Sequence, residues 1–121
     1  MPDRFLINRQ PLTDAEFAAR AGARPELHRF VVAARAAVAR QCRVRAELLY
    51  PEDLSKALMN LAPDDWDDLF IQAAMEEILV QPLTAKLPLL HGRRFLWWGK
   101  PGPESLGAWC VQVAECLRQG E

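Results

Sequence analysis

The sequence predicts an all-α domain, and three observations support this. Apolar residues recur at helical spacing through the stretches 25–44, 64–80 and 106–118. Residue types that suit helix N-caps stand just before several predicted helices, and prolines stand at or beyond the ends of these stretches. A chain of 121 residues is long enough for one domain with a modest core that needs neither metals nor disulfides. We therefore expect a small helical bundle.

Residues 1–24 are expected to form an N-terminal extension that carries one short helix. After an irregular lead, Thr13 and Glu16 have the spacing of a capping box, in which each side chain bonds the backbone N–H of the other residue. The flanking apolar residues have the spacing of a hydrophobic staple, and a glycine suits the C-terminal end. These signals predict a helix over residues 14–21.

The stretch 25–44 is predicted to be the first long helix of a domain that extends over 25–121. Its proline suits a first helical turn, its apolar residues share one face, and several arginines fall on the other side. A shorter helical segment is expected from Pro51 to about Asn60. Pro63 would end this segment, because proline cannot continue a helix.

The stretch 64–80 is predicted to be the helix around which the other elements are organised. Asp64 can cap it, and three further aspartates crowd the first turn, where the helix dipole favours negative charge. Its helical wheel is apolar over most of the circumference and has a single continuous polar strip. Such a helix is either central to a bundle or half buried with a second apolar side offered to a partner, and we expect both. The polar strip comprises Asp65, Asp68, Gln72 and Glu76, one apolar side comprises Trp66, Leu69, Phe70, Ala73 and Val80, and the other comprises Ile71, Ala74, Met75 and Ile78.

Residues 83–103 are expected to be an irregular, tryptophan-rich insertion before the last helix. Prolines and glycines punctuate this stretch, yet its leucines and aromatic residues are too apolar for a free linker. Trp97 and Trp98 either cover one end of the bundle or contact a partner, since exposed tryptophan is favoured at interfaces. Ser105 suits the N-cap of a closing helix over 106–118.

Charged residues are segregated along a chain whose formal net charge is −1 at pH 7. Residues 24–45 carry six arginines, whereas residues 64–77 carry six acids and no base. Either two solvated faces attract each other within the fold, or one of them is a docking surface. The small net charge gives no reason to expect a nucleic acid as partner.

The cysteines Cys42, Cys110 and Cys116 are odd in number and lack Cys-x-x-Cys spacing. This pattern indicates reduced thiols that serve as small core residues. Neither His28 nor His91 stands beside a cysteine at ligand spacing, so we expect no metal site. The sequence has no signal peptide pattern and no apolar run of membrane-span length. We therefore expect a soluble, cytoplasmic protein that binds no membrane.

Four short motifs lie at the ends of the predicted helices. Residues 42–45 (Cys-Arg-Val-Arg) close the first long helix, and residues 50–54 (Tyr-Pro-Glu-Asp-Leu) begin the loop that follows. Residues 61–64 (Leu-Ala-Pro-Asp) lead into the central helix, and residues 105–109 (Ser-Leu-Gly-Ala-Trp) open the last one. In this order, over roughly 27–118, the motifs and helices resemble the acyl carrier protein family.

The resemblance implies a carrier-like helical bundle, and it also identifies a chemical departure. The family has Asp-Ser-Leu at the head of the central helix, and that serine carries the phosphopantetheine arm. The same three places hold Asp64, Asp65 and Trp66 in this chain, and a carboxylate at Asp65 offers no hydroxyl to phosphorylate. We therefore expect no phosphopantetheine and no other cofactor. Ser55 and Ser105 are interpreted as a surface helix residue and an N-cap rather than as attachment sites.

The resemblance further implies that the acidic central helix is a recognition surface, because the family uses it to meet basic patches on partner enzymes. Phe70 stands where the family commonly has an acid, so it is either an exposed apolar anchor or a core residue. The candidate partner-binding residues are Asp64, Asp65, Asp67, Asp68, Phe70, Gln72, Glu76, Glu77, Trp97 and Trp98.

Three functions are therefore open. The first is a non-enzymatic carrier-like protein that has lost its arm and docks on a partner with a basic patch. The second is an unrelated helical adaptor or immunity-type protein whose acidic helix blocks a basic site. An enzyme is the third, but the sequence has no Gly-rich phosphate loop, Ser–His–Asp set or dinucleotide fingerprint. Asp64, Asp65, Asp67 and Asp68 offer the oxygen ligands that Mg²⁺ takes, but adjacent positions on a helix point in different directions, and Asp64/Asp68 is the one pair at i,i+4.

Overall fold

The computed structural model describes residues 9–54, 57–58, 68–83 and 105–119 of the chain. Within these ranges no strand occurs, and the one extended pairing is an isolated antiparallel bridge between Leu54 and Ser105. The prediction of an all-α domain is therefore confirmed. The elements are α1 (Asp14–Arg20), the 3-10 helix η2 (Pro25–Leu27), α2 (His28–Cys42), the 3-10 helix η3 (Ala46–Leu48), α4 (Asp68–Leu79) and α5 (Leu106–Gln119).

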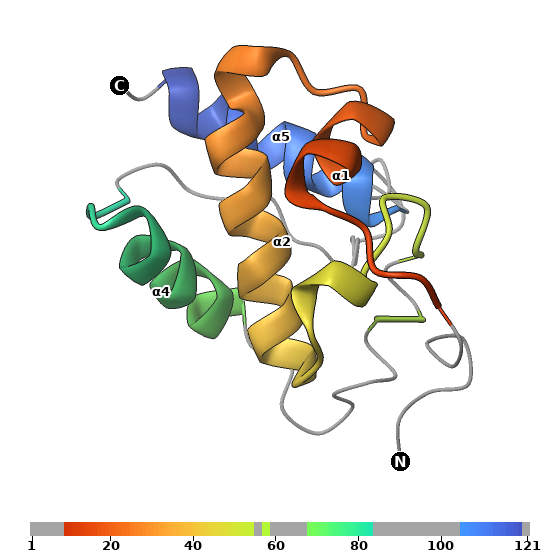
Figure 1. The fold of residues 1–121 in the computed structure, drawn as a ribbon. Coiled ribbons are helices and arrows are strands. Elements are labelled where there is room, and N and C mark those ends of the chain that lie inside the picture. Colours follow the sequence, from red (N-terminus) through yellow and green to blue (C-terminus); the bar gives the residue numbers. More distant parts are fainter. Residues whose placement is uncertain (1–8, 55–56, 59–67, 84–104, 120–121) are drawn as a thin grey trace, which may run out of the picture.

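The central element is α2. It stands between α4 on one side and α1 on the other, and α5 crosses behind it (Figure 1). Of its 15 residues ten are buried, and four of those ten are alanines, whose small side chains let neighbouring helices approach closely. The expectation that the chain is organised around 64–80 is therefore wrong. The described part of that stretch is α4, which packs on α2 but leaves Phe70 and Val80 exposed on its outer side.

The predicted N-terminal helix forms as α1, with the capping box that the sequence indicates. The Glu16 backbone N–H donates to the Thr13 hydroxyl at 3.1 Å, and the Thr13 backbone N–H donates to the Glu16 carboxylate at 2.9 Å. This second bond lowers the pKa of Glu16, so the carboxylate keeps its capping role until acid protonates it. Leu12 and Phe17, which have the spacing of a hydrophobic staple, are both buried.

Three of the helices end in a similar backbone motif. Just past the end of each helix, within two residues, one residue adopts a left-handed conformation. The backbone N–H of the residue after it donates to a carbonyl five residues earlier, as in a Schellman motif. The first long helix was predicted over 25–44, and it comprises η2, α2 and this terminal motif. The left-handed residues are Gly22 (φ 78°) after α1, Arg43 (φ 59°) after α2 and Val80 (φ 56°) after α4, with bonds of 3.1 Å from Ala23 to Ala18, 3.0 Å from Val44 to Ala39 and 3.2 Å from Gln81 to Glu76.

Residues 50–53 form a turn rather than the start of the predicted helix. Asp53 is buried, and its carboxylate accepts hydrogen bonds from the Tyr50 backbone N–H and from the Arg9 guanidinium, each at 2.8 Å. A short acidic side chain that bonds nearby backbone competes with helix formation, which explains the difference. Within this segment the structure describes helical backbone only at residues 57–58, and Asn60 lies outside the described residues.

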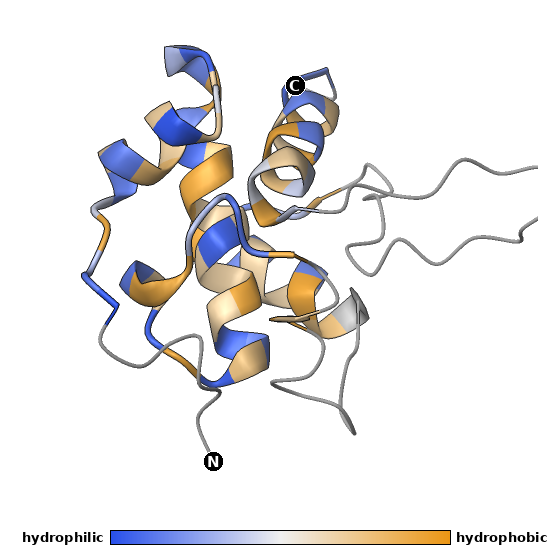
Figure 2. Ribbon diagram, turned by 90° about the vertical axis from the view of Figure 1, so that its right-hand side faces the viewer, coloured by the Kyte–Doolittle hydropathy of each residue, from blue (hydrophilic) through white to orange (hydrophobic). Residues whose placement is uncertain are grey.

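The turn at residues 50–53 also forms hydrogen bonds with the start of α5. The Leu106 and Gly107 backbone N–H groups donate to the carbonyls of Asp53 at 2.7 Å and Pro51 at 2.9 Å. A Cβ at position 107 would lie 2.7 Å from the Pro51 Cβ, so this approach requires glycine. Ser105 caps the helix as predicted, since its hydroxyl accepts a bond from the Ala108 N–H at 3.3 Å. Figure 2 shows the amphipathic banding of α5, whose buried stripe includes Leu106, Trp109, Cys110, Val113 and Leu117.

Arg35 is buried within the fold, although the sequence placed it among solvated arginines. Only 1% of Arg35 is exposed. Its Nη2 donates to the carbonyls of Leu12 at 2.8 Å and Leu49 at 3.0 Å, its Nε also donates to Leu49, and its Nη1 lies 3.2 Å from the Asp14 carboxylate. The guanidinium also stacks 4.5 Å above the Phe17 ring. Burial lowers the pKa of Arg35, and Asp14 opposes that shift, but an arginine remains charged near neutral pH.

We expect Arg35→Met to lower the free energy of unfolding by about 3 kcal/mol, because it leaves two buried carbonyl groups without donors at roughly 1–3 kcal/mol each. Urea denaturation measures this change. Arg40→Met is a matched control on the same helix, where an exposed ion pair is worth less than about 1 kcal/mol. Equal losses for the two variants would contradict the structural role of Arg35.

Candidate functional site

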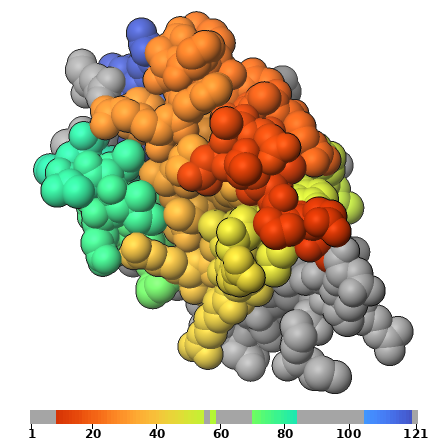
Figure 3. Space-filling model, viewed as in Figure 1, coloured from red at the N-terminus to blue at the C-terminus, as the bar shows by residue number. Residues whose placement is uncertain are grey.

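The surface that α4 offers to solvent is a narrow stripe along one side of the helix. Figure 3 shows α4 at one edge of the molecule, beside the surface of α2. The side of α4 that carries Ile71, Ala74 and Met75 is buried. The opposite side has Phe70, Ala73 and Glu77 at spacing i, i+3 and i+7, which places them on one line along the helix, and Val80 follows at i+10 as the first residue after the helix. This outward stripe consists of Phe70 (47% exposed), Ala73, Glu77 and Val80 (87% exposed).

Half of the predicted partner-binding residues lie outside the described residues. Of Asp68, the structure describes only its position as the first residue of α4. Phe70, the residue for which two interpretations were open, is exposed rather than part of the core. The predicted residues that lie outside are Asp64, Asp65, Asp67, Trp97 and Trp98.

The predicted polar strip does not coincide with the most exposed side of α4. Gln72 and Glu76 are both half buried. Glu76 Oε2 accepts a hydrogen bond from the Leu83 backbone N–H at 2.8 Å, so this carboxylate holds the chain that leaves the helix. The strip borders the buried side because Gln72 and Glu76 lie between buried Met75 and the exposed stripe on the helix surface. The solvent-facing position belongs to the apolar side that contains Phe70.

Glu77 is the charged member of the outward stripe. Its carboxylate lies 3.2 Å from Arg40 Nη1 of α2, with 75% of the Glu77 side chain and 45% of the Arg40 side chain exposed. This pair links the arginine-rich and acidic stretches in the way that the attraction hypothesis predicts. An exposed pair of this kind is worth roughly 0.2–1 kcal/mol, so it costs little to replace Arg40 by another cation.

Val80 is exposed beside the predicted partner-binding residues but was not predicted to be one of them. In the predicted helix it belongs to the apolar side that contains Phe70. Pro82 was the available signal, because a helix that must end before a proline leaves its last apolar side chain without a following turn to pack against. The structure ends α4 at Leu79 and leaves Val80 in the left-handed conformation.

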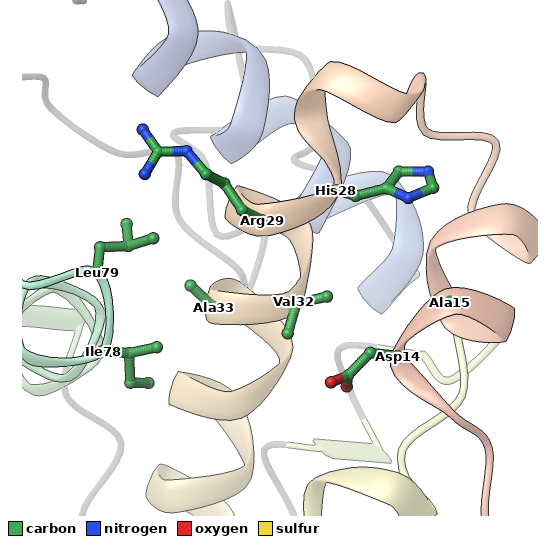
Figure 4. Close-up of a pocket in the computed structure, with 8 residues that line it drawn as sticks. All are labelled: Asp14, Ala15, His28, Arg29, Val32, Ala33, Ile78 and Leu79. Atoms are coloured by element: carbon green, nitrogen blue, oxygen red, sulfur yellow. The ribbon is translucent and has the colours of Figure 1, made fainter.

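A groove of about 530 Å³ lies on the other flank of α4. Its apolar lining comes from Val32 and Ala33 of α2 and from Ile78 and Leu79 of α4, while Ala15 of α1 lies across from α4 (Figure 4). Polar groups stand at the rim. They are Asp14 of α1 and His28 and Arg29 of α2.

The rim groups of the groove take part in contacts within the fold. Asp14 pairs with Arg35 at 3.2 Å, and a His28 ring nitrogen lies 3.2 Å from the Ala23 carbonyl oxygen. The Arg29 guanidinium lies 4.3 Å above the Phe30 ring. These contacts hold the first turns of α1 and α2, and they do not form a nucleophile–base pair.

The three cysteines are free thiols with different exposure. Cys42 and Cys110 are buried, as predicted for core residues, whereas Cys116 is half exposed. Burial raises the pKa of Cys42 to about 12 and raises that of Cys110 as well. A thiol that stays protonated is a poor nucleophile, so Cys42 and Cys110 are structural residues.

We expect iodoacetamide at pH 8 to modify Cys116 first and to modify Cys42 and Cys110 only after urea is added. The shift from 9.0 to about 12 lowers the thiolate fraction of Cys42 by about 1,000-fold. Peptide mass mapping over time measures the order of modification. Fast labelling of Cys42 in the folded chain would contradict its burial.

Because burial raises the pKa of Cys42, the free energy of unfolding is expected to depend on pH. The unfolded chain ionises Cys42 near its ordinary pKa of 9.0, whereas the folded chain does so near 12. The free energy of unfolding is therefore expected to fall as pH rises above about 9.

Within the described ranges, no group of three or more His, Cys, Asp or Glu side chains is arranged to hold a metal ion. No helix in that part of the chain is long and apolar enough to cross a membrane. Compared with known protein families, with curated proteins and with solved structures, the chain matches none. The outward stripe of α4 is therefore the candidate functional site on the basis of its own geometry.

Proposed function

We propose that this chain is a non-enzymatic, acyl-carrier-like interaction protein without a phosphopantetheine arm, which docks through α4 on a partner with a basic patch. The observation that carries the proposal is the outward stripe, in which Glu77 stands between the exposed side chains of Phe70 and Val80. Aromatic residues, phenylalanine among them, are enriched at protein–protein interfaces relative to the rest of the surface.

Charge complementarity favours a basic partner. The described helix α4 carries Asp68, Glu76 and Glu77 and no basic residue. Glu77 already attracts Arg40, so a guanidinium group fits beside it. A partner arginine can take the place of Arg40 at small energetic cost, because both members of the existing pair are exposed.

The carrier-like part of the proposal rests on the resemblance in the sequence together with the helix order. A long helix (α2), a turn at residues 50–53, an acidic helix (α4) and a closing helix (α5) follow one another as in that family. Asp65 stands in the place of the modified serine. A protein of this kind occupies the docking patch of a carrier-dependent enzyme without receiving the arm, and so restrains that enzyme.

Competition for a broad-specificity phosphopantetheinyl transferase tests the proposal. With coenzyme A and a genuine acyl carrier protein as substrate, we expect this chain to raise the apparent KM for the carrier while its own intact mass stays unchanged. Glu77→Lys should weaken the competition at least tenfold, which is about 1.4 kcal/mol of binding. The charge reversal also places a cation beside Arg40, so circular dichroism checks that helix content is kept.

Glu115→Lys is the matched control, because Glu115 is an exposed acid on α5, away from the stripe. It should compete as well as the wild-type chain. If the wild-type chain does not compete, the carrier-like function is wrong, and the adaptor or immunity-type hypothesis takes its place. A gain in mass of one phosphopantetheine would mean that the chain is a working carrier.

A further inference from the structure

Val80 adopts a conformation that valine rarely takes. Its φ is 56°, in the left-handed region, where the two branches at Cβ crowd the backbone. Its side chain is 87% exposed, so burial within the fold does not offset the strain. A strained residue of this kind persists where the surrounding structure holds it, and such residues are concentrated at functional sites.

The helices α1 and α2 end in the same motif, and neither has a β-branched residue at the left-handed position. Gly22 occupies the equivalent position after α1 and has no Cβ, and Arg43 occupies it after α2 with an unbranched Cβ. Val80 is the β-branched residue among the three. Glycine is the common choice for this motif, so the valine side chain costs folding energy that glycine would not.

The backbone around Val80 is held on both sides. The Gln81 N–H donates to the Glu76 carbonyl at 3.2 Å, and the Leu83 N–H donates to the Glu76 carboxylate at 2.8 Å. Leu83 is itself buried. The side chain of Val80 is therefore presented at a fixed place at the end of α4. A β-branched side chain on a fixed backbone loses little freedom when a partner covers it.

We propose that Val80 is a pre-organised apolar anchor for the basic partner, and that this partner has two apolar pockets on either side of a cation. This inference rests on the proposed function. Phe70 would enter one pocket and Val80 the other, and Glu77 would meet the cation. Ten steps of 1.5 Å set the Cα positions of Phe70 and Val80 about 15 Å apart along the axis of α4, with Glu77 nearer Val80, so the two pockets lie on the same scale apart.

The competition assay with the transferase tests the anchor through one substitution that separates folding from binding. Val80→Gly removes the side chain and relieves the strain, so we expect the Tm to rise by about 2–5 °C while competition weakens at least tenfold. Val80→Ile keeps the branched apolar side chain and should compete as well as the wild-type chain. Arg43→Gly makes the same change after α2 and should leave competition unchanged.

The outcomes separate the anchor from the proposed function. If the wild-type chain competes, Glu77→Lys does not and Val80→Gly still does, docking through α4 stands and the anchor is overturned. A Val80→Gly variant with an unchanged or lower Tm would overturn the strain on which the anchor rests. A wild-type chain that fails to compete overturns both proposals.

Discussion

The buried guanidinium of Arg35 is the interaction on which the arrangement of the chain depends. A buried charge must have its hydrogen bonds satisfied, and Arg35 does this with main-chain carbonyls on either side of α2 in the sequence. These bonds bring the segment before α1 and the segment before the turn at 50–53 onto one face of α2. Carbonyl groups of that turn accept hydrogen bonds from the first backbone N–H groups of α5. Helix α4 packs on another side of α2 and leaves Phe70 and Val80 exposed.

Local signals in the sequence predicted most of the helices because capping depends on neighbouring residues. Thr13 and Ser105 cap the helices that they were expected to cap. Burial of Arg35 was not predicted, although its spacing from Val31 (i+4) and Val38 (i−3) places it within the apolar stripe of α2. Whether such an arginine is buried depends on carbonyl groups that lie 14 and 23 residues away, which periodicity along one helix does not reveal.

The sequence predicted only part of the candidate site, because the helical wheel of α4 has two apolar sides. A helix with two apolar sides does not reveal which of them will be buried, since that depends on the shape of the neighbouring helix. The alanine-rich surface of α2 accommodates the side with Met75, which turns Phe70 outward and leaves Gln72 and Glu76 half buried at the border. The left-handed conformation of Val80 could not be predicted from the sequence, because the left-handed position at a helix end is usually assigned to glycine or asparagine.

The bridge between Leu54 and Ser105 closes a long excursion of the chain that includes α4. The chain therefore returns to the place that it left, and on the return path it is fixed at Leu83 and again at Ser105. The end of α4 is therefore tied to α4 itself, through Glu76, whereas the start of α5 is tied to the part of the chain that precedes α4. Loss of one of these contacts would leave the other in place.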